Sequence, residues 1–413
     1  MPPDNILERE TLILYIGKKK THIRKGYRKT TDEKPKTAIK KLKTFSIRSG
    51  LDLPLLFITL TLLVIGLVMM FSASYPNAYY FHHDSHCFIK NQALFATIGV
   101  IAMLAISYFD YHYLHKFAFI FLIISFVLLI LVLLMPPINH VHRWVQFGSF
   151  SFQASEVTKF AIVLSFAHLI SGNFNRMNTF RYGVLPYVII VAPTLLLLAL
   201  EPHISCTVLI VLLSLGMLFI GGTKLRWFGI LFGVVAAGLL YIVLFTNKLT
   251  YANDRIMGWL DPFSATSGVD TWQTKQGLFA IGSGGLLGLG LGNSRQKYLF
   301  LPEPHNDFIF SVVCEELGFI GAMVILVLFA MLIWRGIVVS MRAKDKFGAL
   351  LGIGLTAQIG IQVILNIAVV TNTIPNTGIS LPFFSYGGTS LLMLLAQVGV
   401  VLSISRTANL EKT

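Results

Sequence analysis

Residues 301–334, LPEPHNDFIFSVVCEELGFIGAMVILVLFAMLIW, decide the fold, because a polar segment here passes directly into an apolar one. The apolar part, 309–334, is long enough to cross a bilayer as a helix, which takes about 17–25 residues. Asp307 is therefore expected at the rim of a membrane, where an ionisable group is costly and usually functional. The stretch predicts a transmembrane helix with a candidate site at its beginning.

The composition of the whole chain is that of a membrane protein. Hydrophobic residues make up 55% of the 413 residues, charged residues make up 13%, and the mean hydropathy is +0.72. A soluble domain usually carries about 25% charged residues, so the composition argues against a soluble enzyme or binding module. The three cysteines are too few and too scattered to form a disulfide framework. We therefore expect an all-α integral membrane protein.

Apolar runs of helix length recur along the chain and predict about ten transmembrane helices. The break at 201–203 is the least regular boundary, because its proline excludes a straight helix. The runs lie at 51–73, 91–108, 116–135, 155–171, 184–200, 204–221, 228–246, 309–334, 348–371 and 386–404.

The basic residues predict how these helices are oriented. With the N-terminus in the cytoplasm, most of the 33 lysines and arginines lie inside, 14 of them in a basic tail at 1–50. The membrane domain then spans 51–405, and the tail at 406–413 is also cytoplasmic. A large extracytoplasmic loop, 247–308, joins helices 7 and 8. The basic tail is expected to hold this topology and contact anionic lipid; nucleic-acid binding is not expected, because a recognisable fold is missing.

Asp307 has two interpretations from the residues alone. Asn306 or Asp307 can cap the following helix by accepting hydrogen bonds from its unpaired backbone N–H groups. Alternatively, a carboxylate in a partly desolvated pocket can act as a general base, which contributes ~10²–10⁴-fold to a rate. The neighbouring His305 and Glu303 add ionisable groups to the same segment. Both interpretations stay open at this point.

A glycine-rich run, Gly282–Ser294, also has two interpretations. It lacks the Gly-Lys-Ser/Thr ending of a P-loop, so we do not expect a nucleotide site. It either packs closely against other helices or lines a pyrophosphate with backbone N–H groups. Glu315 and Glu316 lie inside the apolar run that follows, where ionised side chains need partners.

Two basic residues on the predicted outer side, Arg143 and Lys159, are candidates for an anion site. Arginine can clamp phosphate oxygens with two hydrogen bonds, and lysine can add a point charge. The alternative is that both side chains reach the lipid headgroups without specificity. Spacing alone favours neither interpretation.

Two motifs resemble the signatures of the SEDS proteins (shape, elongation, division and sporulation). The first is Leu301–Ser311 followed by Glu315–Phe319, and the second is Thr377–Ser390. The resemblance covers roughly residues 51–405 and leaves out the basic tail. The other similar stretches are Gly66–Ser74, Arg143-Trp144 with Gln153–Lys159, and Leu278–Ser294 with Gln296-Lys297.

The resemblance implies a ten-helix protein of the bacterial plasma membrane that polymerises lipid II as a peptidoglycan glycosyltransferase. It implies a class B penicillin-binding protein as a partner, together with other membrane proteins of the divisome or elongasome. The division or sporulation branch (FtsW or SpoVE) fits better than the elongation branch (RodA). Two other functions stay open, a lipid II flippase and a non-catalytic scaffold that recruits a penicillin-binding protein.

The resemblance also implies roles for individual residues. Asp307 matches the essential aspartate of the family and is expected to deprotonate the sugar 4-hydroxyl of the acceptor. Undecaprenyl diphosphate leaves without a protonating acid, so cations are expected to stabilise its charge. A divalent ion such as Mg or Mn can share that role, although no motif identifies its ligands. The candidate substrate-binding residues are Arg143, Lys159, Arg255, Lys297, Glu303, His305, Ser385 and Gly387.

The chain departs from the family pattern at Glu201–Ser205, which reads Glu-Pro-His-Ile-Ser. Many members have Gln-Pro-Asp-Leu-Gly there, so His203 replaces an acid and Ser205 replaces a glycine. The change puts a role for a second acid at this position in doubt, whereas the motif around Asp307 is intact.

Overall fold

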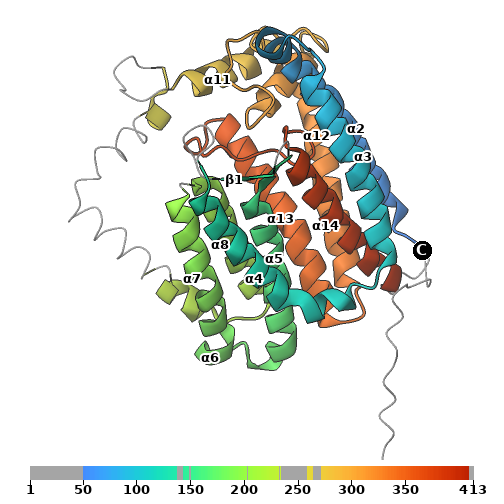
Figure 1. Cartoon of the computed structure of the whole chain (residues 1–413), viewed down its shortest axis with the longest axis vertical. Helices are drawn as coiled ribbons and strands as arrows, with labels where there is room; N and C mark the ends of the chain where they lie inside the picture. The colour runs from blue at the N-terminus through green and yellow to red at the C-terminus, as the bar shows by residue number, and fades with distance from the viewer. Residues whose placement is uncertain are drawn as a thin grey trace, which may run out of the picture. The chain divides into compact units, whose positions relative to one another are not determined.

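The computed structural model of the chain is predominantly helical (Figure 1). It describes residues 50–136, 143–147, 150–201, 203–231, 233, 258–263 and 271–408. The basic tail at 1–49, most of the predicted span 228–246, Arg255 and the last residues, 409–413, lie outside the described residues.

Each predicted apolar run other than 228–246 forms a helix. Within the described residues, eight helices are long and apolar enough to cross a membrane, and one further apolar helix is shorter. The prediction of a helical membrane protein is therefore confirmed. These helices are α2 (Leu53–His82), α3 (Cys87–Tyr108), α4 (His112–Leu134), α5 (Ala154–Asn173), α7 (Leu185–Leu200), α8 (Ile204–Ile220), α12 (Ile309–Met341), α13 (Lys346–Val370) and α14 (Gly388–Thr407).

Local sequence explains where several of these helices begin. Asp52 caps α2, because its carboxylate accepts a hydrogen bond from the Leu55 N–H at 3.0 Å. Asp345 caps α13 in the same way through the Gly348 N–H at 2.9 Å. The irregular boundary predicted at 201–203 separates α7 from α8.

Five short elements were not predicted, because the prediction covered membrane spans only. Strands β1 (Trp144–Phe147) and β2 (Phe150–Gln153) form an antiparallel hairpin in which Trp144 pairs with Gln153. The hairpin leads directly into α5, so it fixes where that helix begins. The loop at 247–308 contains α11 (Trp272–Gly284), and η1 (Phe174–Arg176) and α6 (Phe180–Gly183) lie between α5 and α7.

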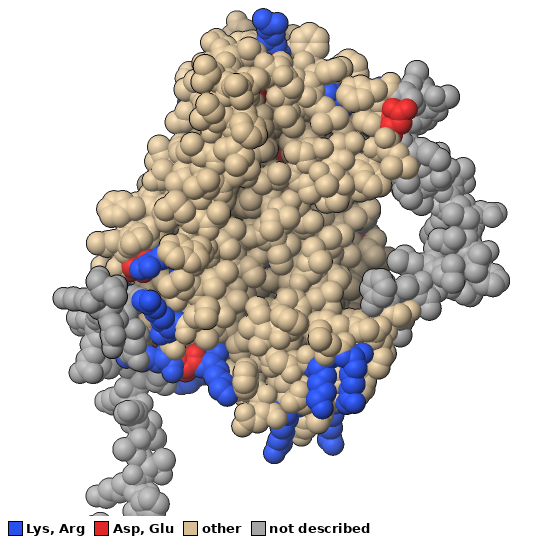
Figure 2. All heavy atoms as spheres, turned by 180° about the vertical axis from the view of Figure 1, so that it is seen from behind, with Lys and Arg blue, Asp and Glu red and all other residues tan. Residues whose placement is uncertain are grey.

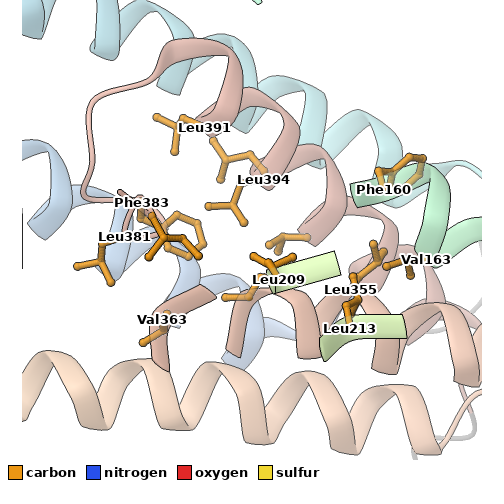
Figure 3. Close-up of a cluster of buried hydrophobic side chains, with 14 of the residues drawn as sticks. Phe160, Val163, Leu209, Leu213, Leu355, Val363, Leu381, Phe383, Leu391 and Leu394 are labelled. Atoms are coloured by element: carbon orange, nitrogen blue, oxygen red, sulfur yellow. The ribbon is translucent and has the colours of Figure 1, made fainter. Parts of the chain in front are cut away.

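Small residues allow the helices to approach closely. Helix α14 packs along α3, α12 along α13 and α4 along α5. A Cβ atom at Gly399 of α14 would lie 2.7 Å from the Met103 carbonyl oxygen of α3, so only glycine fits there. A buried apolar cluster joins α5, α8, α13 and α14 to the loop before α14 (Figure 3). Its labelled members are Phe160, Val163, Leu209, Leu213, Leu355, Val363, Leu381, Phe383, Leu391 and Leu394.

We call the end of the helix bundle that carries Asp307 the outer end and the opposite end the inner end. Many exposed lysines and arginines lie on the connections at the inner end, and Figure 2 shows basic side chains gathered near one end of the molecule. The positive-inside rule expects the cytoplasm on that side. These residues are Lys116, Arg176, Arg181, Lys224, Arg226, Arg342, Lys344 and Lys346.

Candidate active site

A cavity of about 710 Å³ opens at the outer end of the bundle. Its walls come from α3, the β hairpin, the first turns of α5, the beginning of α8, the outer half of α13, residues 378–387 and α14. The charged residues in the wall are Arg143, Glu156, Lys159 and Asp307. Three candidates that lie far apart in the sequence are thus brought together around one cavity.

The segment that carries Asp307 is fixed by its backbone. Its three consecutive carbonyl groups at 305–307 all accept hydrogen bonds from elements late in the chain. The donors are the Tyr386 N–H (2.8 Å), the Ser385 hydroxyl (2.7 Å) and the Asn366 side-chain amide (2.8 Å). The Asn366 amide also donates to the Ile379 carbonyl at 2.7 Å. The two signature segments are therefore held against each other, with α13 as their common support.

Asp307 does not cap the helix that follows it. Helix α12 begins at Ile309, its N-cap residue is Phe308, and no side chain makes a cap hydrogen bond there. The hypothesis of a cap at Asn306 or Asp307 is therefore wrong. The Asp307 carboxylate faces the cavity instead, where Gly378 leaves room for it: a Cβ atom at Gly378 would lie 3.6 Å from Asp307 Oδ2.

The environment of Asp307 suits a general base. Burial, with a contribution from the charge of Glu303, raises the pKa of Asp307 to about 6, although hydrogen bonds from the backbone N–H groups of Asp307 and Phe308 and from Gln273 oppose the rise. A base works best when its pKa lies near the working pH, because it is then both ionised and able to hold a proton. Asp307 is half-buried and lines the cavity, so a substrate hydroxyl can reach it.

Lys159 and Arg143 face the cavity rather than the lipid. The Lys159 side chain is buried, and its ammonium group lies 2.9 Å from Glu156 Oε1 and 3.3 Å from Gln362 Oε1. Arg143 is half-buried at the start of β1, where burial lowers its pKa and the charge of Glu201 opposes the change. Non-specific contact with headgroups does not explain a buried, hydrogen-bonded lysine.

Two further candidates, Ser385 and Gly387, line the cavity and are held in place by hydrogen bonds. Ser385 lies at the turn before α14, where its hydroxyl donates to the Asn306 carbonyl and accepts from the Leu381 N–H at 2.7 Å. The Gly387 N–H donates to Gln92 Oε1 of α3 at 3.1 Å. Both residues shape the wall next to Asp307.

Three other candidates, which the structure describes, do not line the cavity. His305 is buried against the ring of Phe88, with 4.5 Å between the ring centroids. Glu303 is exposed and accepts a hydrogen bond from the Asn306 side chain at 3.1 Å. Lys297 is buried in an ion pair with Glu316 at 2.8 Å, so its charge is used inside the fold. Arg255 lies outside the described residues.

The glycine-rich run packs closely against another helix, as one of its two interpretations predicted. Its residues are not among those that line the cavity. Glu315 and Glu316, which needed partners, find them here: each carboxylate accepts hydrogen bonds from backbone N–H groups of residues 292–296. The two glutamates therefore hold residues 292–296 against α12.

A polar stripe on α13, two of whose three residues line the cavity, was not predicted. Gln358, Gln362 and Asn366 follow one another at intervals of four on α13, so they share one face of the helix. That spacing within an apolar run was the signal that could have found them. His203, at the position where the chain departs from the family pattern, also lines the cavity.

The described residues do not form a metal site. They contain no group of three or more histidine, cysteine, aspartate or glutamate side chains that could hold a metal ion. The Mg or Mn ion expected from the resemblance stays a prediction.

Known proteins resemble this chain over nearly its whole length. Residues 53–410 match the model of the FtsW/RodA/SpoVE family, described as cell cycle protein. Stage V sporulation protein E of Bacillus subtilis (strain 168) is 42% identical over 359 residues, which cover 86% of this chain and 97% of that protein. A probable peptidoglycan glycosyltransferase FtsW of Trichlorobacter lovleyi is 36% identical over 357 residues, covering 86% of this chain and 93% of that protein.

The fold is also that of a solved structure. A chain from "Structural coordination of polymerization and crosslinking by a peptidoglycan synthase complex" superposes with a TM-score of 0.71 and 25% sequence identity, over 88% of this chain and 99% of that one. The predicted likeness to the FtsW and SpoVE branch agrees with the relatives above. The chain belongs to the FtsW/RodA/SpoVE family of cell cycle proteins.

Proposed function

We propose that this protein is a peptidoglycan glycosyltransferase that polymerises lipid II during cell division or sporulation. The observation that carries the proposal is the cavity at the outer end, which Asp307, Arg143 and Lys159 all line. A base suits the acceptor hydroxyl of a glycosyl transfer, and cationic side chains suit its diphosphate leaving group. The FtsW relative carries the name of the same activity.

In the proposed reaction, Asp307 takes the proton of the acceptor 4-hydroxyl. The oxygen then attacks the anomeric carbon of the donor, the bond from that carbon to the diphosphate oxygen breaks, and the configuration inverts. The electron pair leaves with undecaprenyl diphosphate, which needs no proton from an acid. Arg143 and Lys159 stabilise the charge that develops on the diphosphate.

Several residues act by placing these groups. Asn366 and Ser385 hold the backbone on either side of the Asp307 carboxylate. Glu156 and Gln362 fix the direction of the Lys159 ammonium group. Catalysis depends on such placement, because a base misplaced by 1 Å loses much of its effect.

The helices and the similar solved complex support a proposal for where the protein works and with what partner. We place the protein in the bacterial plasma membrane with both termini in the cytoplasm, because the basic residues gather at the inner end. The similar solved structure comes from a complex that coordinates polymerization and crosslinking. We therefore propose a class B penicillin-binding protein as the crosslinking partner, within the divisome or elongasome.

Polymerisation of purified lipid II tests the proposal. The full chain would be assayed with and without its penicillin-binding partner, together with Asp307→Asn and a matched variant, Asp84→Asn. Asp84 is a carboxylate of the outer end that pairs with Lys90 at 2.9 Å and does not line the cavity. We expect glycan strands from wild type and Asp84→Asn, and a loss of ~10²–10⁴-fold for Asp307→Asn. Polymer formed at the wild-type rate by Asp307→Asn would overturn the catalytic role.

A lipid II flippase is the second candidate, and one observation favours it. Gln358 and Gln397 extend the polar wall of the cavity, and their side chains are hydrogen-bonded at 3.0 Å. Gln358 lies 12 residues below the outer end of α13, or about 18 Å at 1.5 Å per residue. Vesicles loaded with labelled lipid II would reveal transport. Transport by Asp307→Asn without polymerisation would favour the flippase, whereas partner binding without either activity would favour the scaffold.

A further inference from the structure

The segment at residues 283–297, which we call the glycine-rich segment, is joined to α12 through the backbone. Gly318 has a φ of 68° and interrupts the helical backbone of α12. The interruption frees backbone groups, which pair with the glycine-rich segment. These bonds are Phe319 N–H to Gly285 O (2.9 Å), Ile320 N–H to Leu286 O (3.1 Å), Leu289 N–H to Glu315 O (2.9 Å) and Gly290 N–H to Glu316 O (3.0 Å).

The approach between the two backbones is too close for side chains. A Cβ atom at Gly288 would lie 2.2 Å from the Glu316 carbonyl oxygen, and one at Gly318 would lie 2.2 Å from the Gly288 nitrogen. The carboxylates of Glu315 and Glu316 accept further N–H groups from residues 292–296. Many polar backbone groups of the segment are thus satisfied by protein, which is what irregular backbone needs at membrane depth.

Two polar contacts between α2 and α12 give the depth of this segment. At the inner end, Asp52 pairs with Arg335 at 2.7 Å, and toward the outer end the Ser72 hydroxyl donates to Glu316 at 2.7 Å. The contacts are separated by 20 residues on α2 and 19 on α12, or about 30 and 28 Å at 1.5 Å per residue. The hydrocarbon core of a bilayer is about 30 Å thick. When the Asp52–Arg335 pair is taken as the inner boundary of that core, Glu316 lies at its outer boundary and Phe319 lies just within it.

The glycine-rich segment exposes three leucine side chains away from the protein. Leu286, Leu287 and Leu291 are exposed to 70%, 80% and 55%. The backbone bonds place the first two beside Phe319 and Ile320 of α12, which are exposed to 59% and 53%. From there the exposed apolar face of α12 continues as a groove of about 340 Å³ that reaches Leu328.

We propose that the glycine-rich segment is a membrane anchor whose Leu286, Leu287 and Leu291 side chains insert among the acyl chains of the outer leaflet. The leucines lie at the same depth as Phe319 and Ile320, the first residues of the exposed apolar face of α12. Lipid is therefore the occupant, because α12 presents this face along its membrane-spanning part. The anchor is joined to the beginning of α12 through Glu315 and Glu316. It therefore sets the height of the Asp307 segment above the hydrocarbon, whatever reaction Asp307 performs.

Fluorescence quenching in nanodiscs tests the anchor without any activity assay. The native cysteines Cys87, Cys206 and Cys314 would be replaced by alanine in the full chain, and an environment-sensitive dye attached to one new cysteine at a time. The test position is Leu287→Cys. Met323→Cys on the exposed face of α12 reports lipid, and Arg295→Cys, an exposed polar position of the same segment, reports water.

Phosphatidylcholine with a nitroxide on its acyl chain is the lipid quencher, and iodide is the aqueous one. We expect acyl-chain quenching at Leu287→Cys within about twofold of Met323→Cys and several-fold above Arg295→Cys, with the reverse order for iodide. Iodide quenching of Leu287→Cys equal to that of Arg295→Cys would overturn the proposal. Protection of Leu287→Cys from both quenchers would also overturn it, because protein would then cover the site.

Discussion

Replacing Asp307 with asparagine separates the energetic effect of a half-buried carboxylate from its chemical use. The pKa of Asp307 rises from 3.8 to about 6, first because of burial and then because of the charge of Glu303. The pKa is thus higher in the folded than in the unfolded chain, so ionisation opposes folding. The penalty is absent below the unfolded pKa of 3.8, grows as pH rises to about 6 and is complete above it.

The size of the penalty follows from the shift. At 1.36 kcal/mol per pKa unit, the ionised carboxylate destabilises the fold by up to about 3 kcal/mol at neutral pH. Asparagine has a similar shape and no charge, so Asp307→Asn is expected to be more stable than wild type by up to that amount at about pH 7.5. Near pH 4 the two proteins are expected to unfold alike.

Two measurements check this reasoning on the same samples. Thermal unfolding by tryptophan fluorescence in detergent, from about pH 4 to 8, reports the stability difference. The polymerisation rate of wild type reports the titration of the base: kcat/KM is expected to fall about tenfold per pH unit below about pH 6. Asp84→Asn should keep this profile. A less stable Asp307→Asn at neutral pH, or a wild-type rate that stays flat down to about pH 4, would refute the reasoning.

The remaining predictions concern the support of the site. Lys297→Met leaves the buried Glu316 carboxylate without its cation and is expected to destabilise the fold by about 3–5 kcal/mol. Adding Glu316→Gln should recover part of this loss, as measured by thermal unfolding. If the double variant recovers nothing, the ion pair is not the cause of the loss. Gly318→Ala is expected to cost at least about 1–2 kcal/mol, because its φ is 68°; an unchanged melting temperature would contradict this. Burial, followed by the charges of Arg143 and Lys159, lowers the pKa of His203 to about 3, so this ring is neutral. His203→Leu should lower kcat/KM about 2–10-fold without moving the pH profile, and His203→Gln should retain more activity.

The spans could be predicted from the sequence because a helix in lipid depends on a local property. An apolar run of about 20 residues satisfies its own backbone hydrogen bonds and needs no distant partner. The same reasoning located Asp307, because it is the last acid before such a run. The sequence also named Arg143 and Lys159 as candidates for an anion site without deciding between that site and lipid contact, and only the fold shows that they share a cavity with Asp307.

The remaining assignments depended on pairings that a sequence does not display. Lys297 was expected at the substrate, but α2 and α12 bring Ser72 and Glu316 to it, and its charge is used there. His305 lies in the signature itself, yet its ring packs on Phe88 from α3. The β hairpin was missed because its short strands give too little alternation to be told from a polar loop.

The amide group of Asn366 has a consequence for exchanging parts between relatives. It donates to the carbonyl groups of both Asp307 and Ile379, so one side chain of α13 joins two loops that lie far apart in the chain. In a chimera that takes only one of these loops from a relative, the backbone of that loop is fitted to the other loop of the relative and not to the one in this chain. The two loops and the outer half of α13 form one transferable module, and grafts intended to alter substrate choice should carry all three together.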